Sequence, residues 1–115
     1  MHPWITTDYS EALLEFIPPP MASATAALDY LRDLQHFVYL QLEGELLWSS
    51  SMPCVVAGGD SIPIARYGSS NIGTMKTVYR RGLGYRYGRT MQVIAGVHYN
   101  YSFSRDFWRA FQQIE

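Results

Sequence analysis

Side chains able to bind a ligand alternate with apolar ones in residues 91–103, MQVIAGVHYNYSF. Read as a β-strand, this segment has one apolar and aromatic face, which is expected to join a core. The other face combines a bare glycine with several hydrogen-bonding side chains and consists of Gln92, Ile94, Gly96, His98, Asn100 and Ser102. Such a face is typical of the floor of a site, although a sheet surface that carries one structural histidine is an equal alternative.

Three carboxylates lie within TTDYSEALLEF, residues 6–16. Oxygen ligands of this kind are the ones that hard divalent ions prefer. Strict alternation along one strand would place Glu11 and Glu15 on one face and Asp8 on the other. Asp8 and Glu15 can therefore share a site only through a bulge or a break between two short strands. Solvated charges on an edge strand are the alternative, and the sequence leaves both open.

Five basic residues interleave with three tyrosines in KTVYRRGLGYRYGR, residues 76–89. Arginine side chains form two parallel hydrogen bonds with phosphate or carboxylate, so the segment suits an anionic ligand. It also suits single-stranded nucleic acid, on whose bases the tyrosines would stack. The preceding loop YGSSNIG, residues 67–73, lacks the spacing of a phosphate-binding P-loop and adds little to either interpretation.

Charge is divided unevenly along the chain. Residues 1–60 hold eight carboxylates and one basic residue, whereas residues 61–105 hold seven basic residues and no acid. The two parts could simply attract each other. Alternatively, the acidic part binds metal ions and the basic part binds an anionic ligand.

Composition indicates a folded domain. The chain has 115 residues, of which 48% are hydrophobic and 15% aromatic, and this composition excludes a disordered protein. No window approaches the roughly 18 to 20 apolar residues of a membrane span, and no signal peptide is recognisable, so we expect a soluble cytoplasmic protein. The single cysteine, Cys54, cannot form an internal disulfide and is expected to be a small buried apolar residue.

Hydrophobic periodicity and turn residues predict an α+β fold with a partial antiparallel sheet packed with helices. In one predicted helix, an apolar stripe faces the core and His36 lies on the solvent side. The expected elements are one strand or two short ones within 4–17, a helix from Ser23 to about Leu42, a turn at 58–60, a loop at 67–73, a helix from about Met75 to Tyr87, a strand at 91–103 and a short helix capped by Ser104.

Five segments, in order, resemble the proteobacterial type of glutamate-cysteine ligase, the ATP-dependent enzyme that begins glutathione synthesis. They are WITTDYSEALLEFI, ELLWSSSMPC, YGSSNIGTMKTVYRRGL, YRYGRTMQ and GVHYNYSF. Departures are modest: Tyr9 stands where Phe is expected, Pro18 where Thr is usual and Ser49 where Pro often occurs. The family's enzymes are several times longer, so the resemblance implies that residues 1–115 are a single partial domain, a fragment of a larger glutamine-synthetase-like catalytic fold.

The resemblance also implies a mechanism and a set of ligands. ATP would phosphorylate the side-chain carboxylate of glutamate, and the amino group of cysteine would attack the acyl phosphate. Asp8, Glu15 and His98 resemble the family's metal-site residues. An imidazole is an unusual ligand for Mg²⁺, so His98 suggests tolerance of Mn²⁺ or a site shaped for bound nucleotide.

The family's cysteine pocket is matched by four residues, Tyr9, Tyr79, Leu83 and Gln92. The resemblance puts Arg80 near this pocket as an anion contact, with a structural ion pair as an equal alternative. Together with the parity argument, it predicts that His98 and Gln92 line one solvent-accessible cavity with Tyr79 near its wall.

Two other classes of function compete with a ligase. A nucleic-acid-binding module would rest on residues 76–89, but the acidic remainder and a sequence pI near 6.3 argue against it. A folded but inactive remnant is the stronger rival, because the isolated chain lacks much of the family's catalytic machinery and is expected to be inactive. The expected partners are the small molecules glutamate, cysteine and ATP, with no nucleic acid, membrane or protein partner implied.

Overall fold

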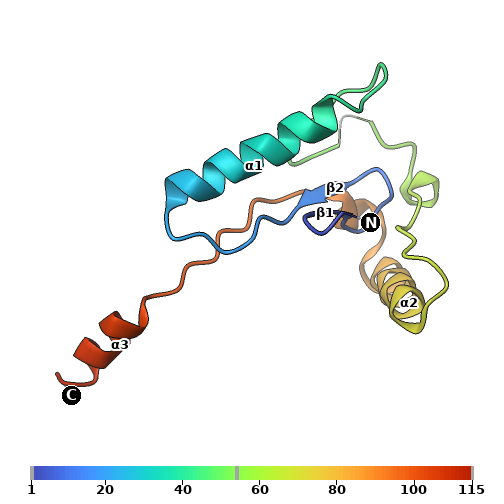
Figure 1. The fold of residues 1–115 in the computed structure, drawn as a ribbon. Coiled ribbons are helices and arrows are strands. Elements are labelled where there is room, and N and C mark those ends of the chain that lie inside the picture. The colour runs from blue at the N-terminus through green and yellow to red at the C-terminus, as the bar shows by residue number, and fades with distance from the viewer. Residues whose placement is uncertain (1, 54, 115) are drawn as a thin grey trace.

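The computed structural model describes residues 2–53 and 55–114, so the expected burial of Cys54 lies outside the described residues. It confirms an α+β fold with a small antiparallel sheet (Figure 1). The elements are β1 (Ile5–Thr7), β2 (Leu14–Phe16), α1 (Ala24–Tyr39), the 3₁₀ turn η1 (Gly59–Ser61), α2 (Asn71–Tyr87), the 3₁₀ turn η2 (Thr90–Val93) and α3 (Arg105–Phe111).

The first two strands form an antiparallel hairpin, which is the two-strand alternative of the sequence prediction. Its paired residues are Ile5 with Phe16, Thr6 with Glu15 and Thr7 with Leu14. Two further main-chain hydrogen bonds extend the ladder at both ends, from the Asp8 N–H to the Leu13 carbonyl and from the Ile17 N–H to the Trp4 carbonyl, each 2.9 Å long. The break between the strands therefore lies in the turn that follows Asp8.

Residues 62–67 run along the hairpin turn and pair with it. Three main-chain contacts define the pairing: an antiparallel bridge between Ser10 and Ile64, a 2.9 Å bond from the Ala65 N–H to the Tyr9 carbonyl and a 3.2 Å bond from the Glu11 N–H to the Pro63 carbonyl. Most of the buried residues gather at this crossing, namely Tyr9, Ser10, Ile62 and Ala65. The core of the chain is thus small and lies where the hairpin turn meets this segment.

Serine caps begin the helices α1, α2 and α3. The hydroxyl oxygens of Ser23, Ser70 and Ser104 each accept a hydrogen bond from the third following main-chain N–H, which satisfies one of the free donors of the first turn. The cap at Ser70 starts α2 at Asn71, four residues before the predicted start, so part of the expected loop 67–73 is helical. Within the described ranges, no helix combines the length and the apolar character needed to cross a membrane.

The predicted helix within 23–42 is confirmed as α1, and its orientation follows the predicted stripe. Leu34 is buried, whereas His36 is exposed, as expected. The helix ends at Tyr39, slightly before the predicted boundary.

The strand predicted at residues 91–103 is wrong. Its first residues form η2, and residues 94–104 have no regular secondary structure. Val97, on the face predicted to join a core, is 98% exposed. Alternation predicts an extended backbone with two faces, but a strand also needs a neighbouring strand to bind its main-chain groups. Among the described residues, no strand pairs with this segment, and its one main-chain bond to another segment runs from the Ala95 N–H to the Ser51 carbonyl.

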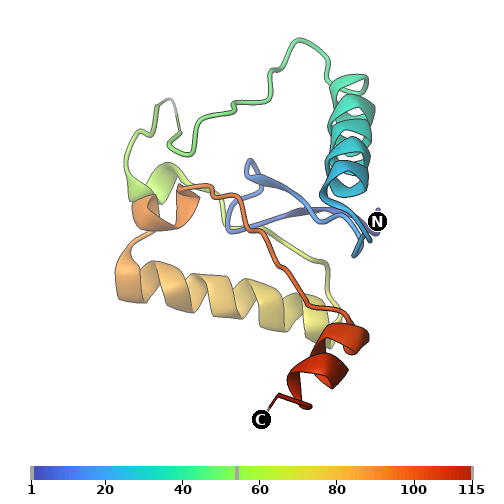
Figure 2. The same cartoon turned by 90° about the vertical axis from the view of Figure 1, so that its left-hand side faces the viewer.

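The molecule is extended rather than spherical. Its radius of gyration is 18.0 Å, whereas a compact domain of this length is expected near 13 Å. Figure 1 shows the reason: residues 94–104 lead away from the hairpin to α3, which stands apart from the other elements. Figure 2 looks along this extension, so α3 lies towards the viewer.

Candidate functional site

The hairpin brings two of the predicted metal ligands to one face. Thr6 is paired with Glu15, and Asp8 lies two residues after Thr6, so all three side chains belong to the same face of the sheet. Asp8 and Glu15 are then diagonal neighbours across the hairpin. The turn between two short strands thus removes the parity conflict that a single continuous strand would have created.

The oxygen atoms of these two carboxylates are suitable ligands for a hard divalent ion, but two carboxylates are too few to complete its coordination. Asp8 is exposed and Glu15 half-buried. Mg²⁺ requires about six oxygen ligands, some of which are normally waters or substrate phosphates. Across residues 2–53 and 55–114, no three side chains of His, Cys, Asp or Glu come together as a metal site, so His98 is not brought to the hairpin carboxylates.

Contacts from Tyr67, which precedes α2, and from Arg80 within α2 fix the main chain at Asp8. The Tyr67 hydroxyl lies 2.5 Å from the Thr7 carbonyl oxygen and 3.0 Å from that of Asp8. The Arg80 Nε donates to the same Asp8 carbonyl at 2.6 Å, and its guanidinium lies 4.6 Å from the centre of the Tyr67 ring. Lys76 adds a second cation 4.9 Å from that ring. Tyr67 and Arg80 therefore hold the end of β1 against α2, and the Asp8 carboxylate is left outside these bonds.

This arrangement is not the structural ion pair weighed for Arg80, and the anion contact near the cysteine pocket stays a prediction. Its guanidinium bonds to a main-chain carbonyl and stacks on an aromatic ring, and the structure gives it no ion pair with a carboxylate among the described residues. No sequence pattern predicted this role for Tyr67. Its hydrogen bonds join residues 60 positions apart, and neither periodicity nor motif spacing signals such a contact.

The residues of the predicted cysteine pocket lie in three environments. Tyr9 is buried with 2% of its surface exposed, and its hydroxyl faces Gly84 of α2 so closely that a Cβ at that glycine would lie 2.5 Å away. Tyr79 is 63% exposed and Leu83 is half-buried; a spacing of four puts both on one face of α2. Gln92 is half-buried within η2.

His98 and Gln92 do not share a strand face, because no strand forms there. His98 is exposed on the irregular segment, and neither residue lines either of the two cavities described here. The parity argument for a common site is therefore wrong. The individual roles implied by the resemblance stay predictions.

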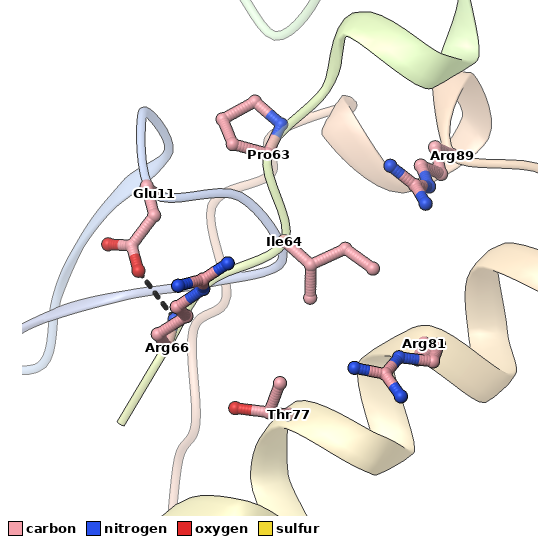
Figure 3. Close-up of a pocket in the computed structure, with 7 residues that line it drawn as sticks. All are labelled: Glu11, Pro63, Ile64, Arg66, Thr77, Arg81 and Arg89. Atoms are coloured by element: carbon pink, nitrogen blue, oxygen red, sulfur yellow. Dashed lines mark hydrogen bonds between the residues drawn. The ribbon is translucent and has the colours of Figure 1, made fainter. Parts of the chain in front are cut away.

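A cavity of about 470 Å³ opens between the hairpin turn, residues 62–67 and α2 (Figure 3). It is lined by Glu11, Pro63, Ile64, Arg66, Thr77, Arg81 and Arg89. One Glu11 oxygen accepts the main-chain N–H of Arg66 at 2.5 Å. The basic segment 76–89 predicted an anionic ligand, and two of its arginines, Arg81 and Arg89, line this cavity. No sequence pattern predicted that Arg66 and Glu11 would join them from other segments.

Comparison with known proteins identifies the family. A sequence model of the glutamate-cysteine ligase family matches residues 1–115. The chain belongs to the glutamate-cysteine ligase family. The resemblance drawn from its five motifs is confirmed, and all of the predicted site residues lie within the matched range.

Individual ligases agree with this assignment. The chain is 55% identical to the glutamate-cysteine ligase of Alcanivorax borkumensis over 99% of its own length and 57% identical to that of Pseudomonas entomophila over 96%. The crystal structure of the glutamate-cysteine ligase of Francisella tularensis in complex with AMP superposes with a TM-score of 0.91 at 42% identity, covering 97% of this chain. The chain spans only about a fifth of these ligases, 21% to 22% of their length.

Proposed function

We propose that this chain forms part of the catalytic site of an ATP-dependent glutamate-cysteine ligase acting in the cytoplasm. Such an enzyme phosphorylates the γ-carboxylate of L-glutamate with ATP and joins it to the amino group of L-cysteine, the first step of glutathione synthesis. The observation that carries the proposal is the family match over the whole chain. The AMP in the Francisella ligase is consistent with ATP as a substrate.

In this proposal, Asp8 and Glu15 bind Mg²⁺ or Mn²⁺. His98, which lies apart from these carboxylates on the irregular segment, would join them as a further ligand only within the longer enzyme. Bound at the hairpin face, the ion would neutralise charge on the phosphates of ATP. The hydrogen bonds of Tyr67 and Arg80 to the carbonyl of Asp8 support a positioning role, because they fix the main chain from which this carboxylate projects.

Tyr9, Tyr79, Leu83 and Gln92 would form the pocket for the cysteine substrate, and Arg80 would lie near it. Tyr79 and Leu83 support this role by their common position on α2, from which both could contact one small side chain. The buried ring of Tyr9 packs against the same helix at Gly84. The small-molecule substrates would then be glutamate, cysteine and ATP.

A chimera tests the proposal. Residues 2–114 replace the matching segment of the Alcanivorax ligase, with which the chain aligns over 114 residues. The Asp8→Asn and Glu15→Gln variants keep the side-chain volume but remove a ligand charge, so we expect ligase activity to fall by about tenfold or more and the Mg²⁺ requirement to rise. Asp29→Asn is the matched control, because Asp29 is exposed on α1 and forms an ion pair with Arg32.

Two outcomes decide between a ligase and an inactive remnant. A chimera without turnover, or unchanged metal dependence in both carboxylate variants, would contradict the proposed roles. The isolated chain is assayed beside it and should form no γ-glutamylcysteine, because two hairpin carboxylates alone are an incomplete ligand set and should bind Mg²⁺ and ATP at best with a Kd on the order of millimolar.

A further inference from the structure

The 470 Å³ cavity concentrates positive charge apart from the predicted metal ligands and cysteine-pocket residues, none of which lines it. Three arginines and one carboxylate contribute to its wall, which leaves an excess of two positive charges. Figure 3 shows Arg66 beside Glu11 on the hairpin side and Arg81 and Arg89 on the α2 side, with Ile64 between them. The arginines therefore approach the cavity from opposite walls.

Most of the guanidinium donors are available to a ligand. The structure gives the side chains of Arg66 and Arg81 no hydrogen bond or ion pair within the described residues. The Arg89 Nη1 donates a hydrogen bond to the Ile62 carbonyl at 3.1 Å, and the other N–H groups of this guanidinium stay available to a ligand. The one carboxylate is already partly satisfied, since a Glu11 oxygen accepts the Arg66 N–H.

A second cavity, of about 240 Å³, continues on the other side of Arg81 and Arg89, which line both. Its wall includes three glycines, Gly59, Gly84 and Gly88. At Gly88 a Cβ would meet nothing within 4 Å, so main chain is open to a ligand at the end of α2, whereas the Tyr9 hydroxyl covers Gly84. Asp60 adds one carboxylate to this wall, so its net charge is smaller than that of the first cavity. An anionic group held between Arg81 and Arg89 could thus belong to a molecule that extends into either cavity.

We propose that this arginine cavity is a separate binding site for a small dianion of the phosphate class, held by Arg81 and Arg89 with Arg66 opposite. Paired guanidinium groups match the oxygens of phosphate in geometry and charge. The volume is within the range of small-molecule sites, roughly 300 to 1,000 Å³. The site does not depend on the ligase activity proposed above, and either proposal can fail without the other.

Titration of inorganic phosphate into the chain tests the site, with sodium chloride at the same ionic strength as the reference for screening. Saturable shifts of the Arg81 and Arg89 side-chain NMR signals and a calorimetric Kd are the readouts. Arg81→Gln should weaken phosphate binding by about tenfold, because a charge-assisted hydrogen bond is lost. Glu11→Gln should strengthen it by about threefold, because a like charge is removed while the amide oxygen can still accept the Arg66 N–H.

Arg86→Gln is the matched control, since Arg86 lies on the same helix, carries the same charge and lines neither cavity. It should leave the phosphate Kd unchanged. Equal losses in the Arg81 and Arg86 variants, shifts that chloride reproduces, or a chain without cooperative unfolding would each overturn the proposal. So would binding of a polyglutamate peptide without binding of phosphate, which would indicate a protein partner instead.

Discussion

Two regions of this chain are held together in opposite ways. The hairpin–α2 unit, defined as residues 5–16, 62–67 and 71–87, is joined by main-chain pairing and by polar side chains that reach across it, such as Tyr67 and Arg80. The C-terminal segment, residues 94–114, is held mainly by aromatic rings stacked on one another, with Phe103 and Phe107 at 4.2 Å between ring centres. Those rings remain substantially exposed, Phe107 by 41% and Trp108 by 50%.

The two regions differ in whether the chain itself supplies the partners that their residues need. Main-chain pairing in the hairpin–α2 unit is completed by segments that the chain itself contains. The aromatic residues of the C-terminal segment leave an apolar surface that the described residues do not cover, and the chain spans only 21% to 22% of the related ligases. Mutations in the two regions should therefore affect stability very differently.

The largest effect is expected at Gly73, where α2 meets the preceding loop. This glycine is buried, and a Cβ there would lie 2.8 Å from the Gly68 carbonyl oxygen and closer still to that of Tyr67. Gly73→Ala must displace main chain and should lower the free energy of unfolding by about 1 to 3 kcal/mol, measured by urea denaturation.

The control for this substitution lies in the same helix. At Gly82 a Cβ would meet nothing within 4 Å, so Gly82→Ala should raise the free energy of unfolding by about 1 kcal/mol through helix propensity alone. If Gly73→Ala stabilised the chain as Gly82→Ala is expected to, the close packing of α2 on residues 67–68 would be disproved.

The next effect concerns two tyrosines of the hairpin–α2 unit. The Tyr9 hydroxyl is buried without a hydrogen-bond partner among the described residues, whereas the Tyr67 hydroxyl bonds to the carbonyls of Thr7 and Asp8. Tyr9→Phe should therefore stabilise the chain by about 1 kcal/mol, and Tyr67→Phe should destabilise it by a similar amount. Thermal unfolding of the two variants measures the contrast, and equal shifts in Tm would contradict the assigned hydrogen bonding.

Local signals in the sequence predicted much of this fold. The apolar stripe predicted α1 and the serine cap at Ser104 predicted α3, because amphipathic packing and capping depend on residues a few positions apart. The helix α2 was predicted to begin four residues late, because its cap, Ser70, was assigned to the loop. The prediction of a strand at 91–103 was wrong for the opposite reason. Alternation is a local pattern, but a strand also depends on a partner strand from elsewhere in the chain, and the described residues provide none for this segment.

The candidate site was predictable in chemistry but not in arrangement. The family resemblance selected Asp8 and Glu15, yet their common face depends on where the hairpin turns, which the residue pattern left undecided. The arginine cavity combines Arg66 with Arg81 and Arg89 because residues 62–67 pair with the hairpin turn more than 50 positions earlier. Contacts over such distances are set by the folded topology and leave no mark on local spacing.

The smallest effect is expected in the C-terminal segment, from Phe107→Ala. Truncating a buried phenylalanine typically costs about 3 to 5 kcal/mol, but Phe107 stacks on exposed neighbours rather than on the hairpin–α2 unit. We expect the global free energy of unfolding to change by less than about 0.5 kcal/mol.

Hydrogen exchange at Ala65 measures this change in global stability, because this fully buried residue donates its N–H to the Tyr9 carbonyl inside the hairpin–α2 unit. The Ala95 N–H, bonded to Ser51 at 2.7 Å beside exposed residues, should exchange faster in both proteins despite its shorter bond. Slower exchange at Ala95 than at Ala65, or a loss of protection at Ala65 in the variant, would mean that the aromatic segment is an integral part of the core.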